Sequence, residues 1–255
     1  MKPYFKVAII TILSLMSFVP LPARSDQKQT MAPIPMKKLT LVFPVSKETA
    51  LGKWVNLIYT EAFRRLNMEF EFVAYPGKRA SLAADDGQVD GEFIRVYTYG
   101  GDHPNLIRVE EAVLSVRFAA FATDPSIRLR GWDDLRGTDY KVEYMLGIKR
   151  CKEKLSGVVR PENLYATNNA VQGIEKLILG RADIYVNSEL FIRDILKSKK
   201  FASSSVRYAG LLEEIPHYLY LHNKHRELAP KFSEVFKAMK EEGLIEKYRS
   251  AVVNE

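Results

Sequence analysis

The feature that most constrains the fold of this chain is an alternation of short apolar runs with amphipathic helical stretches. Apolar segments at 39–43, around Phe70 and Phe72, and at 89–96 are predicted strands, and the stretches between them place apolar residues at helical spacing. Such an order of strand, helix, strand, helix, strand is typical of a sheet covered by helices. The sequence therefore predicts an α/β fold.

The same alternation returns in the second half of the chain. Strands are predicted at 140–144 and 184–186, on either side of a helix at 167–179. Both halves also contain one kind of turn, in which a glycine ends a helix and an aspartate opens a strand: 87–90 and 180–183. We expect two similar lobes, each a mixed sheet flanked by helices. The alternative is one continuous domain, since such turns are short and common.

Two extended apolar segments are predicted to cross between the lobes. They lie at 112–123 and 217–222, and together they would act as a hinge. This arrangement assigns 38–117 and 210–255 to lobe 1, and 118–209 to lobe 2. Ligands commonly bind in the cleft between such lobes, and the lobes close around them.

The N-terminus has the layout of an export signal. Lysines precede a charge-free run at 7–19, and small residues occupy positions −3 and −1 of a cut after Ser25. We therefore predict a cleaved signal peptide at 1–25, a flexible leader at 26–37 and a periplasmic location. The alternative is a membrane anchor, but a spanning helix needs about 20 apolar residues and this run is shorter.

The net charge of +7 invites a nucleic-acid hypothesis, which the export signal weakens. Cleavage after Ser25 removes three basic residues and no acidic one, so the net charge falls to +4. No basic module with interleaved aromatic residues is present, and a secreted chain rarely meets nucleic acid. The single cysteine, Cys151, cannot form an internal disulfide and has no resolving partner for redox chemistry. We expect a monomer with no nucleic-acid partner.

Motifs for catalysis and metal binding are missing from the sequence. It contains no G-x-S-x-G elbow, no H-E-x-x-H and no common phosphate loop. His217 and His222 are five residues apart, which places them on opposite faces of a strand, so a joint metal site with His225 is disfavoured. We expect no cofactor and no enzyme activity. These histidines are the only support for the alternative of a periplasmic enzyme.

Three arginines are candidates for an anionic ligand. Arg79 follows a Pro-Gly turn, Arg95 ends the third predicted strand and Arg117 lies on the first crossing segment. A guanidinium binds carboxylate or phosphate through paired hydrogen bonds. The alternative for each is a structural or solvated ion pair.

The surroundings of these strand ends add further candidates. Strand alternation places Phe93, Arg95 and Tyr97 on one face, near the strand end where open α/β sheets bind ligands. An exposed strand end would show the same pattern. In the second half, Tyr144 and Gly147 lie at a strand-to-helix turn whose backbone N–H groups can hold an anion.

Several segments together resemble a known family. The apolar run 118–123, followed by Gly-Trp-Asp-Asp-Leu-Arg-Gly at 131–137, resembles the crossing strand and W-x-D-L-x-G motif of bacterial extracellular solute-binding proteins of family 3. These are the periplasmic receptors of amino-acid-type ABC importers. The segments 171–183 and 225–248 are similar to that family as well, and 75–95 resembles a divergent branch with mostly unassigned ligands. The resemblance implies a two-lobed, periplasmic-binding-protein-like (type II) fold.

The resemblance also has departures that bear on the ligand. Amino-acid receptors of the family usually carry an Arg for the α-carboxylate in a T-x-x-R-type segment, which 97–101 lacks. Where they carry an Asp for the α-ammonium, this chain has Asn187 and Ser188, and a buried ammonium without a carboxylate partner is costly. Tyr75 lies where the family often places an aromatic wall. The departures count against a standard α-amino acid.

We therefore expect a periplasmic receptor that captures a small polar ligand, with an anion favoured by the arginines. It would close on the ligand and present it to the membrane permease of an ABC importer. The alternative is a ligand-sensing partner of a membrane receptor. The predicted ligand contacts are Tyr75, Arg79, Arg95, Tyr97, Arg117, Tyr144, Gly147, Asn187 and Ser188.

Overall fold

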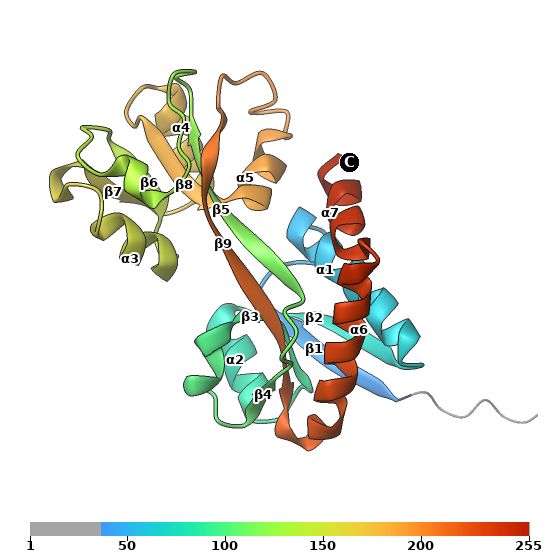
Figure 1. Cartoon of the computed structure of the whole chain (residues 1–255). Helices are drawn as coiled ribbons and strands as arrows, with labels where there is room; N and C mark the ends of the chain where they lie inside the picture. Colours follow the sequence, from blue (N-terminus) through green and yellow to red (C-terminus); the bar gives the residue numbers. More distant parts are fainter. Residues whose placement is uncertain (1–36, 255) are drawn as a thin grey trace, which may run out of the picture. The chain divides into compact units, whose positions relative to one another are not determined.

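The computed structural model describes residues 37–254, which form an α/β fold built on one nine-stranded mixed sheet (Figure 1). The predicted signal peptide and the predicted leader up to residue 36 lie outside the described residues. The strands are β1 (Lys38–Phe43), β2 (Glu69–Ala74), β3 (Gly91–Val96), β4 (Leu106–Arg108), β5 (Leu114–Ala122), β6 (Val142–Met145), β7 (Leu164–Thr167), β8 (Ile184–Ser188) and β9 (Arg207–His222).

Helices flank this sheet. The α-helices are α1 (Ala50–Arg65), α2 (Gly77–Asp85), α3 (Lys149–Ser156), α4 (Ala170–Ile178), α5 (Glu189–Leu196), α6 (Ala229–Glu241) and α7 (Leu244–Asn254). Short 3-10 helices span Tyr97–Gly101, Trp132–Leu135, Pro161–Asn163 and Asn223–Leu228. No helix within 37–254 is long and apolar enough to cross a membrane.

Two strands connect the two lobes. The sheet order is β2-β1-β3-β9-β5-β8-β6-β7, with β4 also paired to β9. β1, β2 and β3 are parallel, as are β6, β7 and β8, whereas β5 and β9 run antiparallel to each other and to their other neighbours. Figure 1 shows β5 and β9 passing from one set of parallel strands to the other. The segment predicted at 112–123 is confirmed as the crossing strand β5, whereas the second crossing strand, β9, begins at Arg207, ten residues before the predicted segment 217–222. The residue bounds assigned to the lobes stay predictions.

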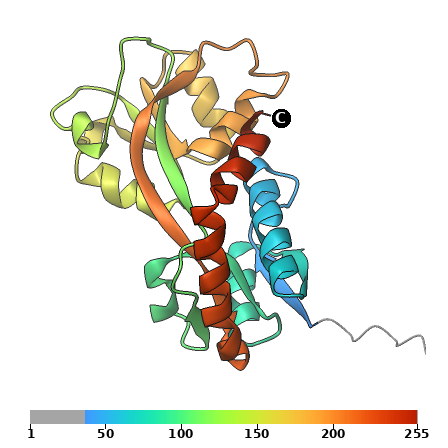
Figure 2. The same cartoon turned by 45° about the vertical axis from the view of Figure 1, so that its right-hand side comes forward.

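Helix α1 follows directly from its sequence. The Thr49 hydroxyl accepts a hydrogen bond from the N–H of Gly52 at 3.1 Å, which caps the first turn. One stripe of the helix is then buried against the sheet and the C-terminal helices: Trp54, Val55, Ile58, Tyr59, Ala62 and Phe63. Figure 2 shows α6 and α7 beside α1. The apolar spacing that predicted this helix also gives its buried face.

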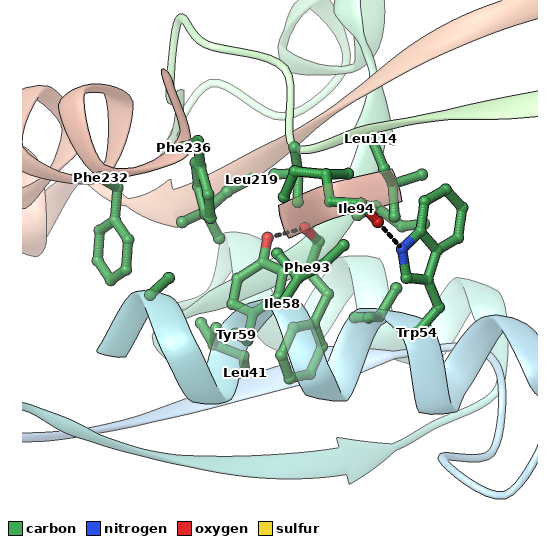
Figure 3. Close-up of a cluster of buried hydrophobic side chains, with 14 of the residues drawn as sticks. Leu41, Trp54, Ile58, Tyr59, Phe93, Ile94, Leu114, Leu219, Phe232 and Phe236 are labelled. Atoms are coloured by element: carbon green, nitrogen blue, oxygen red, sulfur yellow. Dashed lines mark hydrogen bonds between the residues drawn. The ribbon is translucent and has the colours of Figure 1, made fainter. Parts of the chain in front are cut away.

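The hydrophobic core packed against α1 contains several aromatic rings among aliphatic side chains (Figure 3). The fully buried Tyr59 donates a hydrogen bond to the carbonyl of Phe93, and their ring centroids are 4.7 Å apart with nearly perpendicular planes. Burial raises the pKa of Tyr59 well above its ordinary value. Trp54 is a buried core residue, and it donates its indole N–H to the carbonyl of Ile245 at 2.9 Å.

The other lobe is held by two further apolar clusters between 116 and 215. Asn169 caps α4, because its side chain accepts from the N–H of Gln172 at 3.0 Å. Helix α3 follows the strand-to-helix turn predicted at Tyr144 and Gly147, although charged residues dominate it and only Cys151 and Leu155 are buried. Burial raises the pKa of the Cys151 thiol to about 12, so this thiol is unreactive at neutral pH.

Candidate functional site

A pocket of about 310 Å³ lies where the carboxyl ends of β1, β3, β6 and β8 meet the crossing strands β5 and β9. This is the position at which open α/β sheets bind ligands. Its volume is at the small end of the range for ligand pockets. The lining residues are Phe43, Val45, Thr49, Ala50, Leu51, Ile94, Arg95, Val116, Met145, Ser188, Phe191, Asp194 and His217.

The wall of the pocket is mainly apolar. Phe43 and Met145 end strands of the two lobes, Val116 comes from β5, and Leu51 and Phe191 come from the helices α1 and α5. Phe191 is 36% exposed, which leaves a large part of its ring open to an incoming molecule. Such a wall stabilises a bound ligand by removing apolar surface from water.

Arg95 reaches the pocket with its charge already matched. Its Nε donates to Oε2 of Glu92 at 2.6 Å, and Glu92 is only 1% exposed. The hydroxyl of Tyr99 donates to the other oxygen of this carboxylate, so the buried acid is satisfied on both sides. A ligand anion at Arg95 would therefore compete with Glu92.

The pairing of Arg95 with Glu92 corrects a prediction. Strand alternation placed the two side chains on opposite faces of β3, and this is wrong. The register of β3 against β9 shifts between Glu92 and Arg95, and an irregularity of this kind changes the direction of the residues that follow it. As a result Ile94 and Arg95 both line the pocket, and Tyr97 already begins a 3-10 helix.

His217 presents a neutral ring to the pocket. Its Nδ1 lies 2.9 Å from the carbonyl oxygen of Ile215, and because a carbonyl only accepts, Nδ1 carries the proton. Burial lowers the pKa of His217 below its usual value, and the nearby charge of Arg95 acts in the same direction. Nε2 is then a hydrogen-bond acceptor, and it has no partner among residues 37–254.

Asp194 supplies the negative charge of the pocket. It lies on α5, and its Oδ2 is 3.4 Å from the backbone N–H of Ala50, the first residue of α1. The positive end of a helix dipole favours a carboxylate there. Sequence reasoning did not single out Asp194 as a binding residue. A usable signal existed, because Asp194 lies three and four residues after Phe191 and Leu190, a spacing that puts them on neighbouring parts of one helix surface.

Of the nine predicted ligand contacts, Arg95 and Ser188 line this pocket. Tyr75 and Arg79 stack on each other instead, with the guanidinium carbon 4.4 Å from the ring centroid. Tyr97 is 56% exposed and lies beneath the guanidinium of Arg108 at 3.5 Å. Ligand roles for these three residues stay predictions.

The remaining four predicted contacts have other surroundings. Arg117 pairs with Glu189 at 3.2 Å, and Tyr144 is buried in an apolar cluster. Gly147 occupies an exposed turn with φ of +92°, a backbone conformation that favours glycine. Asn187 is 1% exposed and accepts from the N–H of Ser188 at 2.7 Å, so it supports the residue that lines the pocket. Their roles in ligand binding also stay predictions.

The other two histidines of the proposed metal alternative lie outside the pocket lining. His225 Nε2 is 2.7 Å from Oδ1 of Asp90, and His222 Nδ1 accepts from the N–H of Lys224 at 3.3 Å. Within 37–254 no three His, Cys, Asp or Glu side chains are grouped so that they could hold a metal ion. The pocket thus offers apolar walls, one matched cation, one carboxylate and one neutral imidazole.

Comparison with known proteins places the chain in a family. No model of a known protein family matches the sequence. An uncharacterized protein of Shewanella oneidensis is 36% identical over 197 residues, which cover 77% of this chain and 75% of that protein. The chain belongs to the family of this Shewanella protein.

Solved structures of other proteins share the fold of this chain. The L-cystine solute receptor of Neisseria gonorrhoeae, in its unliganded open conformation, is similar with a TM-score of 0.65 at 17% identity, over 86% of this chain and 93% of the receptor. A histidine kinase sensor domain with similarity to periplasmic binding proteins is similar with a TM-score of 0.60 at 17% identity. The match covers 85% of this chain and 96% of the sensor domain. These likenesses confirm the predicted two-lobed, periplasmic-binding-protein-like α/β fold.

Proposed function

We propose that this protein is a periplasmic solute-binding receptor that captures a small ligand in the pocket and delivers it to the membrane permease of an ABC-type importer. The observation that carries the proposal is the pocket itself. Its lining comes from both lobes, with Phe43 and Arg95 on one side, Met145 and Ser188 on the other, and Val116 on a crossing strand. A ligand held by both lobes favours a closed arrangement, because it gains contacts that an open one lacks.

The export signal predicted at 1–25 and the likeness to a cystine receptor support the periplasmic role. The likeness to a histidine kinase sensor domain supports a second candidate, in which the same closure is read by a membrane receptor. Permease and ATPase genes beside this gene would favour import, and a receptor gene would favour sensing. An enzyme is the third candidate, and turnover that survives alanine at His217, His222 and His225 would remove its sequence support.

The sequence favours an anionic ligand, but the pocket makes the binding of an anion less favourable. Arg95 is the one arginine of the lining, and Glu92 already holds its guanidinium. A carboxylate ligand would have to share Arg95 with a buried carboxylate of the same sign.

The proposal is tested by a thermal-shift screen of small metabolites on the protein produced from the full-length chain. We expect a subset of compounds to raise the melting temperature of the wild type, because a ligand that binds only the folded state stabilises it. Ser188→Phe, which puts a ring at the pocket wall, should lose this response. Ser203→Phe makes the same change at an exposed serine outside the lining and should keep it.

Two outcomes would contradict the proposal, the first its receptor function and the second its assignment of the ligand site to this pocket. One is a wild type that responds to no amine, amino acid, organic acid or peptide fragment. The other is an equal response of the wild type and Ser188→Phe to every active compound, which would place binding outside this pocket.

A further inference from the structure

The titratable groups of the pocket lining are Arg95, Asp194 and His217. The charge of Arg95 is matched by Glu92, whose 1% exposure keeps the two groups together out of water. His217 is uncharged at neutral pH, since burial lowers its pKa. Asp194 is therefore the acidic lining group that has no ion pair within 37–254, and its contact in the structure is a 3.4 Å approach to one backbone N–H.

Besides Arg95, whose Nη2 lies against Glu92 without a hydrogen bond, the free hydrogen-bonding groups of the pocket are mainly acceptors. Asp194 offers carboxylate oxygens, and the unprotonated Nε2 of His217 has no partner in the described part of the chain. The Ser188 hydroxyl can donate or accept. A ligand that satisfies this set needs a head group rich in N–H donors.

The rest of the wall suits an apolar body. Phe43, Leu51, Val116, Met145 and Phe191 surround the polar groups. Two of these side chains are aromatic, and an aromatic face attracts a cation as well as apolar atoms. The volume of about 310 Å³ is at the small end of the range for ligand pockets, so we expect a small body.

Other arginines near this region are paired outside the lining. Arg117, Arg193 and Arg249 all contact the carboxylate of Glu189, at distances between 2.8 and 3.4 Å. Glu189 is 4% exposed, and none of the four residues lines the pocket. The three arginines contact Glu189 outside the pocket lining, so none of them offers its guanidinium to a ligand in the pocket.

We propose, on the basis of the receptor function above, that the ligand is a protonated amine with an apolar body, bound at its ammonium group by Asp194 with the Nε2 of His217 as a second acceptor. The ammonium matches the single unmatched carboxylate, and the body covers the apolar wall. This class differs from the α-amino acids, since the pocket has no unpaired arginine for an α-carboxylate.

The test is calorimetric titration of the wild type with probes that share one body and differ in head group. They are 2-phenylethylamine, 3-phenylpropanoate and phenylalanine. We expect the amine to bind at least tenfold more tightly than the carboxylate or the zwitterion. Asp194→Asn should weaken amine binding about tenfold. Asp86→Asn removes the same charge at an exposed position outside the lining and should leave it unchanged.

A second variant tests the role assigned to Glu92. Glu92→Gln frees the guanidinium of Arg95, so 3-phenylpropanoate should gain affinity while the amine loses it. Circular dichroism identifies a Glu92→Gln protein that does not fold, and in that case the exposed Asp194→Asn variant decides alone.

The outcomes separate this proposal from the receptor function. Carboxylate binding that equals or exceeds amine binding, or amine binding that Asp194→Asn leaves intact, overturns the amine class alone. Failure of all three probes together with hits of another class in the metabolite screen also overturns the amine class and leaves the receptor function standing. Failure of every compound in that screen overturns the receptor function itself.

Discussion

Adjacent residues of β5 face two pockets of opposite character. Val116 lines the apolar pocket of about 310 Å³, whereas Arg117 lines a second pocket of about 500 Å³. The second pocket is mostly polar and is lined by Trp54, Leu114, Ser115, Arg117, Glu214, Lys240, Gly243, Ile245, Glu246 and Arg249. Side chains alternate along a strand, so these neighbouring residues face different pockets. Arg95 and Arg117, both predicted as anion ligands, therefore line two separate pockets.

The larger pocket is the poorer candidate for a ligand, because most of its charged side chains already form ion pairs. Lys240 pairs with Glu111 at 2.6 Å, and Arg249 pairs with Glu246 at 2.9 Å. A ligand there would have to break these pairs before it gained contacts. The smaller pocket has apolar walls and free acceptors, so a ligand adds contacts without displacing any ion pair. The ion pairs of the larger pocket therefore favour a structural role for it, and the free acceptors of the smaller pocket favour ligand binding.

The largest expected effect is the loss of stability when the ion-pair cluster around Glu189 is broken. Glu189→Gln leaves three arginines around a buried neutral amide, and we expect it to lower the free energy of unfolding by about 2 kcal/mol. This is below the usual cost of breaking a buried pair, because Arg117 and Arg193 are 29% and 41% exposed and water screens them. Urea denaturation measures the change. A loss below about 0.5 kcal/mol would show that the cluster is not structural.

The next effect belongs to the apolar pocket. Phe191→Ala removes a half-open ring from the wall, so we expect about a tenfold loss of affinity for any ligand found in the screen. Stability should change little, since the ring is 36% exposed. Calorimetry and urea denaturation on the same preparation separate these two quantities. A Phe191→Ala variant that loses stability but keeps its affinity would show that Phe191 has a structural role and not a binding role.

A smaller effect concerns pH and His217. Its pKa in the folded protein is lowered, so below about pH 6.5 the unfolded chain takes up the proton more readily than the folded one. The contribution of a neutral His217 to stability is thus complete above that pH and is lost as the pH falls toward the folded-state pKa. We expect the melting temperature of the wild type to fall more steeply between about pH 7 and pH 5 than that of His217→Gln. Parallel curves would contradict the burial assigned to this ring.

The smallest expected effect is the change in stability on substitution of Glu246 in the polar pocket, which serves as a control for Glu189→Gln. Glu246 is 66% exposed in its pair with Arg249, and exposed pairs contribute little. We expect Glu246→Gln to change the free energy of unfolding by less than about 0.5 kcal/mol. A change as large as that of Glu189→Gln would mean that burial does not distinguish the two acids.

The sequence predicted the elements of the fold better than the contacts of the site. The alternation of apolar runs located β1, β3, β8 and α1, because strand and helix periods are set by the local backbone. The pairing of Glu92 with Arg95 could not be predicted, since it depends on a register shift against β9, a strand that is distant in the sequence. The place of Asp194 beside Ala50 depends on how α5 packs against α1, which no local pattern specifies.

The most direct test of the receptor function places a phenylalanine side chain in each of the two pockets in turn. Ser188→Phe narrows the apolar pocket, and Ser115→Phe narrows the polar one. Calorimetric titration of both variants with the strongest ligand from the screen should show binding lost in Ser188→Phe and retained within about threefold in Ser115→Phe. Binding that survives Ser188→Phe and disappears in Ser115→Phe would contradict the assignment of the ligand site to the apolar pocket.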